Sequence, residues 1–356
     1  MKIELISASS EQLKTPPSTL SGVVFGTLFS DHMFCMEWDD GKGWHSAQIK
    51  PYGPLKLEPS SMVLHYAQMS FEGLKAYKIE TGEHALFRPR ENFKRMNRTA
   101  QRMCIPELDV EEILDALKQL LRLDSRWIPG EDGTSLYVRP TILATEEAIG
   151  LKVSSKYLLF IILSPVGPYY SQGFNPVNIM VSEKYIRAVP GGIGFAKTGG
   201  NYAASILAEK EAKELGYTQV LWLDAVERRY IEEVGSMNIF FVIYDSIVTP
   251  MLTGSILPGI TRMSVIELGK HWGLHVEERR ITIDEILKGL EDGSVTEVFG
   301  AGTAAVISPV GILAHKGKDF EVGNGKTGPV AMRFYEQLTG IQYGRESDPF
   351  GWLELT

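Results

Sequence analysis

The chain has 356 residues, of which 44% are hydrophobic and 22% are charged, a composition typical of globular proteins. This length exceeds that of an ordinary single-core domain, so we expect two domains. The net charge of -8 argues against broad nucleic-acid affinity, and no apolar run reaches the length of a membrane span. Two cysteines distant in sequence, Cys35 and Cys104, and residues 1–20 without a signal or transit pattern predict a cytoplasmic protein.

In the first half of the chain, residues 1–20 are polar and are expected to form a surface arm. A helix is predicted over 91–103, and helical spacing of apolar residues predicts a second helix that Asp109 caps. Four basic residues of the first helix, Lys94, Arg95, Arg98 and Arg102, are interpreted as a solvated face, because the chain is acidic overall. Apolar and β-branched stretches predict strands at 34–38, 71–77, 85–87, 135–143 and 157–164.

The second half alternates predicted strands and helices, which indicates a mixed α+β or α/β fold rather than an all-helical one. Strands are predicted at 178–181, 219–223, 239–242 and 297–299, and helices near 203–215, 262–272, 283–290 and 328–338. We predict a small N-terminal α/β domain over 1–168, a linker over 169–181 and a larger C-terminal domain over 182–356.

One lysine, Lys197, lies between two glycine clusters in residues 191–202. The glycines allow the backbone to approach a ligand closely, and a helix start, with Asn201 as its N-cap, favours anions. Gly216 is placed to end this helix, whose predicted apolar side comprises Ile206, Leu207, Ala212 and Leu215. A buried lysine can lose its proton near neutral pH and form a Schiff base with an aldehyde cofactor. A surface lysine in a flexible loop would satisfy this stretch equally well.

Four other stretches supply groups that suit the same cofactor. A carboxylate and a small hydroxyl residue precede an apolar strand in 231–242. Residues 256–262 place Pro-Gly before a helix, whose free N–H groups form a phosphate site. A tight Gly/Thr turn follows a strand in 297–305, and residues 86–90 contain two guanidinium groups. Together with the lysine, these groups suggest pyridoxal phosphate.

The order and wording of these motifs resemble the branched-chain amino acid aminotransferases, which are fold-type IV pyridoxal phosphate enzymes, from about residue 23 to residue 343. The resemblance is strongest in Lys-Thr-Gly-Gly-Asn-Tyr, Glu-Val-Gly-Ser-Met-Asn, Leu-Pro-Gly-Ile-Thr-Arg, Phe-Gly-Ala-Gly-Thr-Ala and Tyr-Val-Arg-Pro. It implies a two-domain fold with the lysine in the C-terminal domain, and a homodimer. The implied reaction is ping-pong transfer of an amino group between leucine, isoleucine or valine and 2-oxoglutarate, with no metal.

The resemblance also implies a role for each matching residue. Lys197 would hold the cofactor and move the substrate's α-proton, and Tyr202 would contact the ring hydroxyl. Glu233 would face the ring nitrogen, while Glu232, its neighbour on the strand, would point away to solvent or a surface cation. The implied phosphate ligands are Arg88, Ser236, Ile260, Thr261 and Thr303, with Arg90 facing solvent. The implied substrate contacts are Phe29, Tyr66, Phe71, Tyr137, Arg139, Tyr169, Thr303 and Ala304.

Several alternatives share part of this pattern. D-amino acid aminotransferase and aminodeoxychorismate lyase have the same fold, lysine and glutamate, but the chain length and the Tyr-Val-Arg-Pro motif favour the branched-chain interpretation. A non-catalytic pyridoxal phosphate carrier would not need Glu233. The interpretation as a dinucleotide-dependent oxidoreductase is supported only by the loose glycine fingerprint at 300–305. We reject it because 307–313 reads as a strand with Pro309 and not as the required helix.

Overall fold

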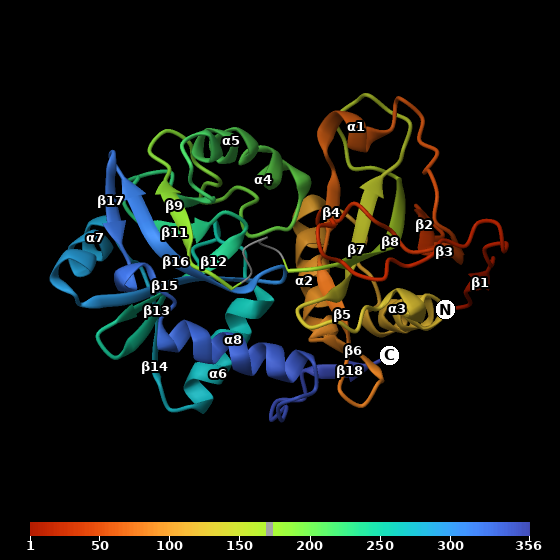
Figure 1. The fold of residues 1–356 in the computed structure, drawn as a ribbon. Coiled ribbons are helices and arrows are strands. Elements are labelled where there is room, and N and C mark those ends of the chain that lie inside the picture. The colour runs from red at the N-terminus through yellow and green to blue at the C-terminus, as the bar shows by residue number, and fades with distance from the viewer. Residues whose placement is uncertain (169–173) are drawn as a thin grey trace. The chain divides into compact units, whose positions relative to one another are not determined.

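The computed structural model describes residues 1–168 and 174–356, and the chain divides into two compact units (Figure 1). Unit 1 comprises Met1–Tyr169, Ala196–Gly199 and Gly340–Thr356, and unit 2 comprises Tyr170–Phe195 and Gly200–Thr339. This division differs from the predicted domains, because Lys197 and the C-terminal residues group with unit 1. Part of the predicted linker 169–181 is also a strand of unit 2, and its residues 169–173 lie outside the described residues.

Unit 1 is built on one sheet. Its strands are β1 (Glu4–Leu5), β2 (His32–Asp39), β3 (Gly43–Pro51), β4 (Met69–Phe71), β5 (Leu74–Lys78), β6 (His84–Phe87), β7 (Ser135–Ala144), β8 (Lys156–Val166) and β18 (Leu353–Leu355). Its helices are α1 (Met62–Tyr66), α2 (Pro89–Met103), α3 (Val110–Leu123) and the 3-10 turn η1 (Ser125–Trp127). Within the described residues the strand order is β1-β3-β2-β8-β7-β5-β6-β18, with β4 paired to β7. The predicted strand over 71–77 is therefore two strands, which are interrupted at Glu72 and Gly73.

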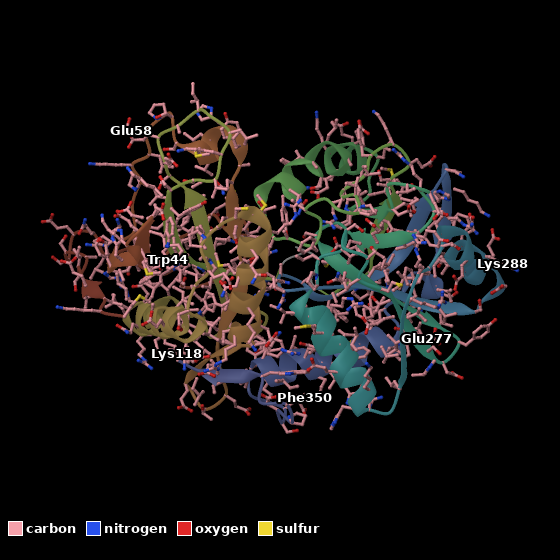
Figure 2. The ribbon with its side chains drawn as sticks, turned by 180° about the vertical axis from the view of Figure 1, so that it is seen from behind. Trp44, Glu58, Lys118, Glu277, Lys288 and Phe350 are labelled. Carbon is pink, nitrogen blue, oxygen red and sulfur yellow. The ribbon has the colours of Figure 1, made fainter. Side chains whose placement is uncertain are left out.

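The two long helices α2 and α3 pack beside each other and against the sheet of unit 1 (Figure 1). As predicted, Asp109 caps α3, and its side chain accepts hydrogen bonds from two backbone N–H groups at 3.0 Å. The apolar stripe of α3 is buried in the core, as its spacing predicts. The C-terminal strand β18 is held to both helices, because Glu354 accepts from Lys118 of α3 (Figure 2) and from Arg90 of α2.

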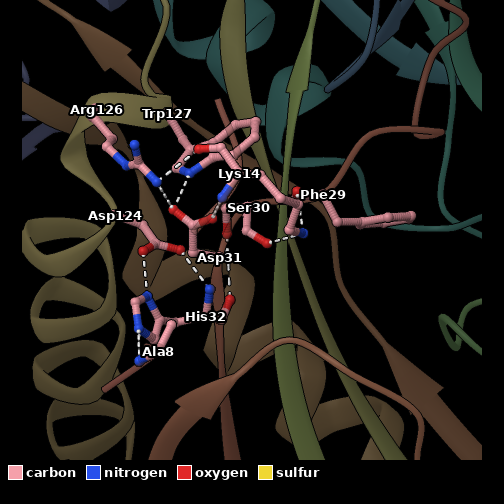
Figure 3. A network of polar contacts seen from close by, with 9 residues as sticks. All are labelled: Ala8, Lys14, Phe29, Ser30, Asp31, His32, Asp124, Arg126 and Trp127. Carbon is pink, nitrogen blue, oxygen red and sulfur yellow. Dashed lines mark hydrogen bonds and ion pairs between the residues drawn. The ribbon is translucent and has the colours of Figure 1, made fainter. Parts of the chain in front are cut away.

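The predicted surface arm is held to unit 1 by the polar network in Figure 3. The backbone N–H of Ala8 donates to Nε2 of His32 at 3.0 Å, so the ring proton lies on Nδ1, 2.6 Å from Asp124. The ammonium group of Lys14 donates to the carbonyl oxygens of Phe29 and Ser30 at 2.9 and 2.7 Å. These contacts fix the arm against the start of β2 and the end of α3.

Asp31 is the most heavily bonded carboxylate of this network, and Asp31→Asn should destabilise unit 1. Its buried side chain accepts from Trp127 Nε1, Arg126 and the backbone N–H of Lys14 at 2.7, 2.5 and 2.8 Å. Burial raises the pKa of Asp31, but these donors outweigh it and lower the pKa overall. Losing charge-assisted hydrogen bonds costs about 1.5–3 kcal/mol.

The stability that Asp31→Asn loses relative to wild type should be largest above the pKa of an aspartate in the unfolded chain. This difference should shrink as the pH falls toward and through the lower pKa of Asp31 in the folded protein. Melting temperatures of wild type and Asp31→Asn, measured from pH 7 to pH 3, would test this sign. Asp39→Asn, at a more exposed ion pair with Lys42, is the control and should have a small effect. A difference between wild type and Asp31→Asn that does not narrow in acid would contradict the argument.

Unit 2 is built on a second sheet. Its strands are β9 (Val177–Val181), β10 (Gln219–Leu223), β11 (Ile231–Val234), β12 (Met237–Ile243), β13 (Ser246–Pro250), β14 (His275–Arg279), β15 (Val295–Gly302), β16 (Val306–His315) and β17 (Lys318–Glu321). The helices that belong to it wholly or for the most part are α4 (Gly199–Ala203), α5 (Ile206–Glu214), α6 (Ile260–His271), α7 (Ile283–Asp292), η2 (Gly323–Gly325) and α8 (Pro329–Gln342). Among the residues that the structure describes, the order is β11-β10-β9-β16-β15-β12-β13-β14, and β11 also pairs with β12, which closes six strands into a ring.

The helices of unit 2 lie near their predicted places, with two local corrections. Asn201 lies inside α4 and donates to a backbone carbonyl, so it is not an N-cap. The predicted apolar side of α5 is wrong for Ile206, Leu207 and Leu215, which are exposed, and right for Ala212, which is buried. Ala208 is buried with Ala212, and their small side chains allow α5 to pack closely on β10. The strand predicted over 307–313 is confirmed by β16, which supports rejecting the dinucleotide fingerprint.

Candidate active site

Lys197 is fixed at its backbone by unit 1. Its N–H donates to Oγ1 of Thr99 at 2.9 Å, and its carbonyl oxygen accepts from the N–H of Phe71 at 3.0 Å. The hydroxyl of the next residue, Thr198, donates to the carbonyl oxygen of Met69 at 2.7 Å. The half-buried side chain places Nζ 4.9 Å from the centroid of the Phe71 ring. This lysine is therefore a positioned group between α2 and β4 and not part of a flexible surface loop.

Of the two predicted substrate residues of β7, Arg139 lies over the same aromatic ring and Tyr137 bonds to Arg139. The guanidinium carbon of Arg139 lies 4.9 Å from the Phe71 ring centroid, and Nη2 donates to the Tyr137 hydroxyl at 3.1 Å. Nε of Arg139 is buried without a hydrogen-bond partner, which leaves a donor for an acceptor such as a carboxylate. Gly73 makes room for this arrangement, because a Cβ there would lie 2.0 Å from the Tyr137 hydroxyl oxygen. Lys197 and these side chains form one cluster.

A buried ion pair beside this cluster was not predicted. Glu72 is fully buried and accepts from Nε and Nη2 of Arg95 at 2.7 and 2.9 Å and from Asn92 at 2.8 Å. Burial raises the pKa of Glu72, but Arg95, with help from Lys197 and Asn92, lowers it overall. The prediction that Arg95 belongs to a solvated face is wrong, because only 3% of Arg95 is exposed. A fixed negative charge therefore lies next to Phe71.

Lys75 is a second residue that the sequence did not single out. It pairs with Tyr137 across β5 and β7, so both side chains leave the same face of the sheet. Burial lowers the pKa of Lys75 to about 8. The face that carries Tyr137 and Arg139 therefore also carries a buried amine.

In unit 2, Glu233 is 4% exposed and its carboxylate is held by three donors. Arg187 forms an ion pair with it, and the side chain of Asn238 and the N–H of Leu257 donate at 3.2 and 3.3 Å. A small cavity beside it is lined by Arg187, Asn201, Tyr202, Ser205, Glu233, Gly235, Ser236 and Leu257. Three predicted cofactor residues thus meet at one cavity, while Arg187 and Asn238 were missed. Asn238 stands in the Glu-Val-Gly-Ser-Met-Asn motif, whereas Arg187 has no distinctive sequence signal.

The other residues of unit 2 that are predicted to bind the phosphate gather at the same end of its sheet. The β11–β12 turn carries Ser236, and β12 runs antiparallel to β15, which ends just before Thr303. Helix α6 begins nearby with Ile260 and Thr261, because Gly259 approaches β12 so closely that a Cβ would lie 2.0 Å from Oδ1 of Asn238. Hydroxyls and free helix N–H groups together suit a phosphate.

Arg88 belongs to unit 1 and precedes α2 in a left-handed conformation, with φ of 49°. Such a backbone is uncommon for a residue other than glycine. Its N–H donates to the Trp352 carbonyl oxygen at 2.7 Å, and its guanidinium carbon lies 4.8 Å from the Trp352 ring centroid. Arg90 instead pairs with Glu111 at 2.7 Å and with Glu354.

The other predicted residues have separate surroundings. Phe29 stacks on Tyr52 with centroids 5.0 Å apart. Tyr66 is 37% exposed and its hydroxyl donates to the carbonyl oxygen of Ile149. Neither contact involves the Phe71 ring. Ala304 is half-buried in the β15–β16 turn beside Thr303, and Tyr169 lies outside the described residues.

Glu232 differs from its prediction. It leaves β11 on the opposite face from Glu233, but it is buried, with 4% exposed, and does not reach solvent. Its Oε1 accepts from the Ser255 hydroxyl, while Oε2 is buried without a partner. Burial raises the pKa of Glu232, and Ser255 and Arg187 offset this only in part.

Neither a membrane span nor a metal centre stands out in the part of the chain that the structure describes. No helix there is long and apolar enough to cross a bilayer. No group of His, Cys, Asp or Glu residues in the same part could hold a metal ion.

Residues 69–312 match the family model described as Amino-transferase class IV. Branched-chain-amino-acid aminotransferase 2 of Bacillus subtilis (strain 168) is 53% identical over 352 residues, covering 99% of this chain and 96% of the relative. Branched-chain-amino-acid transaminase 1 of the same organism is 54% identical and covers 95% of both chains.

Solved structures of branched-chain amino acid aminotransferases also match this chain. The Escherichia coli enzyme gives a TM-score of 0.76 at 30% identity, covering 90% of this chain and 98% of its own. The enzyme of the archaeon Thermoproteus uzoniensis, solved with norvaline, gives a TM-score of 0.75 at 27% identity, covering 90% of this chain and 99% of its own.

Proposed function

We propose, because the chain belongs to the class IV aminotransferase family, that it is a branched-chain-amino-acid transaminase. It transfers an amino group between leucine, isoleucine or valine and 2-oxoglutarate. The observation that carries this assignment is the cluster in which Lys197 and Arg139 face one ring, that of Phe71. Full-length similarity to branched-chain relatives favours this function over D-amino acid aminotransferase and aminodeoxychorismate lyase.

The residues present fit pyridoxal 5'-phosphate as the cofactor. Glu233 offers a buried carboxylate to the ring nitrogen, and Tyr202, at the same cavity, suits the ring hydroxyl. Lys197 supplies the amine for its attachment. When bound, the cofactor supplies an electron sink for the substrate's α-carbon. The phosphate would be held by Arg88, Ser236, Thr261, Thr303 and the backbone N–H of Ile260.

Different residues of the chain would then transfer the proton, bind the substrate carboxylates and exclude water. Nζ of Lys197 takes the proton from the substrate's α-carbon and later returns one, as a general base and acid. Arg139 and the Tyr137 hydroxyl bind a substrate carboxylate, and the Phe71 ring excludes water from the apolar side chain. The backbone N–H groups of Thr303 and Ala304 would hold the α-carboxylate.

A panel of amino donors tests this function. With 2-oxoglutarate as acceptor, leucine, isoleucine and valine should give glutamate and should bleach the visible absorption band of the holoenzyme. D-Alanine should do neither. Turnover of D-alanine without turnover of leucine would overturn the assignment and favour the D-amino acid alternative, and pyruvate formation from aminodeoxychorismate would favour the lyase.

Arg139→Met should lower kcat/KM for the dicarboxylate 2-oxoglutarate more than for 2-oxoisocaproate, whose side chain is apolar. The lost hydrogen bond to a charged group corresponds to about 1.5–3 kcal/mol, or roughly a 10- to 150-fold lower kcat/KM. Steady-state kinetics with both oxo acids measure the difference. Arg126→Met, in the polar network of unit 1, is the control. If Arg139→Met left kcat/KM for each oxo acid at its wild-type value, Arg139 would not belong to the site.

We also propose a cytoplasmic homodimer, which the exposed apolar side chains of unit 1 support. Leu64 on α1 and Ile149, Leu151 and Val153 in the loop after β7 are between 57% and 81% exposed. Such a patch on a folded protein usually marks an interface. Both cysteines are free thiols, as in a reducing compartment.

Leu151→Asp should raise the dimer dissociation constant at least about tenfold, because it places a charge in the proposed interface. Sedimentation velocity over a concentration series measures this constant. Val226→Asp in unit 2, which is also highly exposed, should leave it unchanged. A dimer that tolerates Leu151→Asp would place the interface elsewhere, and a monomeric wild type would contradict the dimer itself.

A further inference from the structure

We propose that Ser255 and Glu232 position Glu233 through Arg187, so that a polar chain around β11 orients the carboxylate that faces the cofactor ring. The proposal rests on the proposed function in one respect, namely that Glu233 is the partner of the ring nitrogen. Ser255 and Glu232 are then positioning residues, which touch neither substrate nor cofactor.

The contacts run without a break from one carboxylate to the other. Glu232 and Glu233 are neighbours on β11 and leave it on opposite faces. The Ser255 hydroxyl donates to Oε1 of Glu232, and the Ser255 carbonyl oxygen accepts from Nη2 of Arg187. The same guanidinium nitrogen pairs with Oε2 of Glu233. Ser255 therefore connects the two faces, with its side chain bound on one and its backbone on the other.

The segment that carries Arg187 is packed tightly against Ser255. A Cβ at Gly194 would lie 2.3 Å from the Ser255 carbonyl oxygen and 2.5 Å from the Cβ of Ala188. Ser255 itself is completely buried. Because this packing leaves little free space, the direction of the Ser255 carbonyl fixes where the guanidinium group can lie.

The distribution of charge explains why Glu232 and Ser255 support Arg187, and why Arg187 in turn supports Glu233. Arg187 makes its ion pair with Glu233, whereas Glu232 receives only a hydroxyl hydrogen bond and leaves Oε2 unpartnered. The hydroxyl of Thr253 lies 2.9 Å from the Ser255 hydroxyl oxygen, and because the Ser255 proton is given to Glu232, this second bond is one that Ser255 accepts. Without the bond to Glu232, the Ser255 backbone loses its anchor, and Arg187 can turn away from Glu233.

The test measures cofactor binding in two backgrounds. Apo-enzymes carrying Ser255→Ala or Glu232→Gln are titrated with pyridoxal 5'-phosphate, alone and combined with Glu233→Gln, and the Kd and absorption maximum are recorded. In the wild-type background each change should raise Kd about five- to tenfold and shift the absorption maximum. In the Glu233→Gln background each should change Kd by less than about twofold, because the shared partner is already lost.

The controls separate positioning from general damage. Ser182→Ala removes another buried hydroxyl of unit 2, which bonds to the Tyr185 backbone, and it should not change Kd. Glu232→Gln keeps the side-chain volume but replaces the carboxylate with a neutral amide, which weakens the hydrogen bond from Ser255, so it still provides the test if Ser255→Ala fails to fold.

If Ser255→Ala and Glu232→Gln raised Kd equally in the wild-type and Glu233→Gln backgrounds, or left Kd at its wild-type value, the positioning role would be overturned. The assignment of Glu233 would be unaffected. A Glu233→Gln enzyme with unchanged Kd, absorption and kcat would instead overturn the assignment of Glu233 and this proposal with it.

Discussion

Lys197→Ala should fold normally and lose transamination, with kcat lower by about 10³-fold or more. The side chain is both the proposed nucleophile and the proposed general base, and general acid–base catalysis alone contributes about 10²- to 10⁴-fold. Folding should survive, because Thr99 and Phe71 hold the lysine through its backbone, which alanine retains. The substitution leaves the proposed phosphate donors in place, so the variant should still bind pyridoxal 5'-phosphate reversibly.

Single-turnover and steady-state rates with leucine and 2-oxoglutarate measure the loss, and a melting curve checks the fold. Lys210→Ala is the matched control, because Lys210 is an exposed lysine of α5 that pairs only weakly with Glu214 at 3.6 Å. Partial rescue of Lys197→Ala by a small primary amine would support the general-base role. A variant that retains more than a small fraction of wild-type kcat would disprove the assignment.

The residues around Lys197 show what the sequence could and could not predict. Its motif predicted the lysine, because the glycines and the following helix are local features. The partners of its segment lie far away in sequence, since Thr99 precedes Lys197 by 98 residues and Met69 precedes Thr198 by 129 residues. No periodicity reports such contacts. The burial of Arg95 was missed for the same reason, because its partner Glu72 lies 23 residues earlier, between β4 and β5.

Burial likewise explains which strands and helix faces were predicted from the sequence. Strands β7 and β8 are long and largely buried, so their apolar sequences identified them. Strands β14 and β17 carry charged residues and contain no buried residue, and no apolar pattern indicated them. In α5 Ile206 and Leu207 face outward and the alanines face the sheet, so side-chain hydrophobicity alone placed the two larger residues on the wrong side of the helix.

Glu233→Gln should lower kcat by about 10²-fold or more while the cofactor stays bound, because a neutral amide cannot balance positive charge on the ring nitrogen. It should also destabilise the protein by about 3–5 kcal/mol, since it leaves the buried charge of Arg187 without its carboxylate.

These two effects can be separated by also removing the arginine. Arg187→Met combined with Glu233→Gln removes both charges, so the melting temperature should recover while kcat stays low. A double variant that regains kcat together with stability would mean that Glu233 serves folding only. Glu232→Gln should lose far less kcat than Glu233→Gln, because Glu232 acts only through Ser255 and Arg187. If Glu232→Gln were the more damaging change, the residue that faces the ring would be Glu232, and the assignment of β11 would be off by one position.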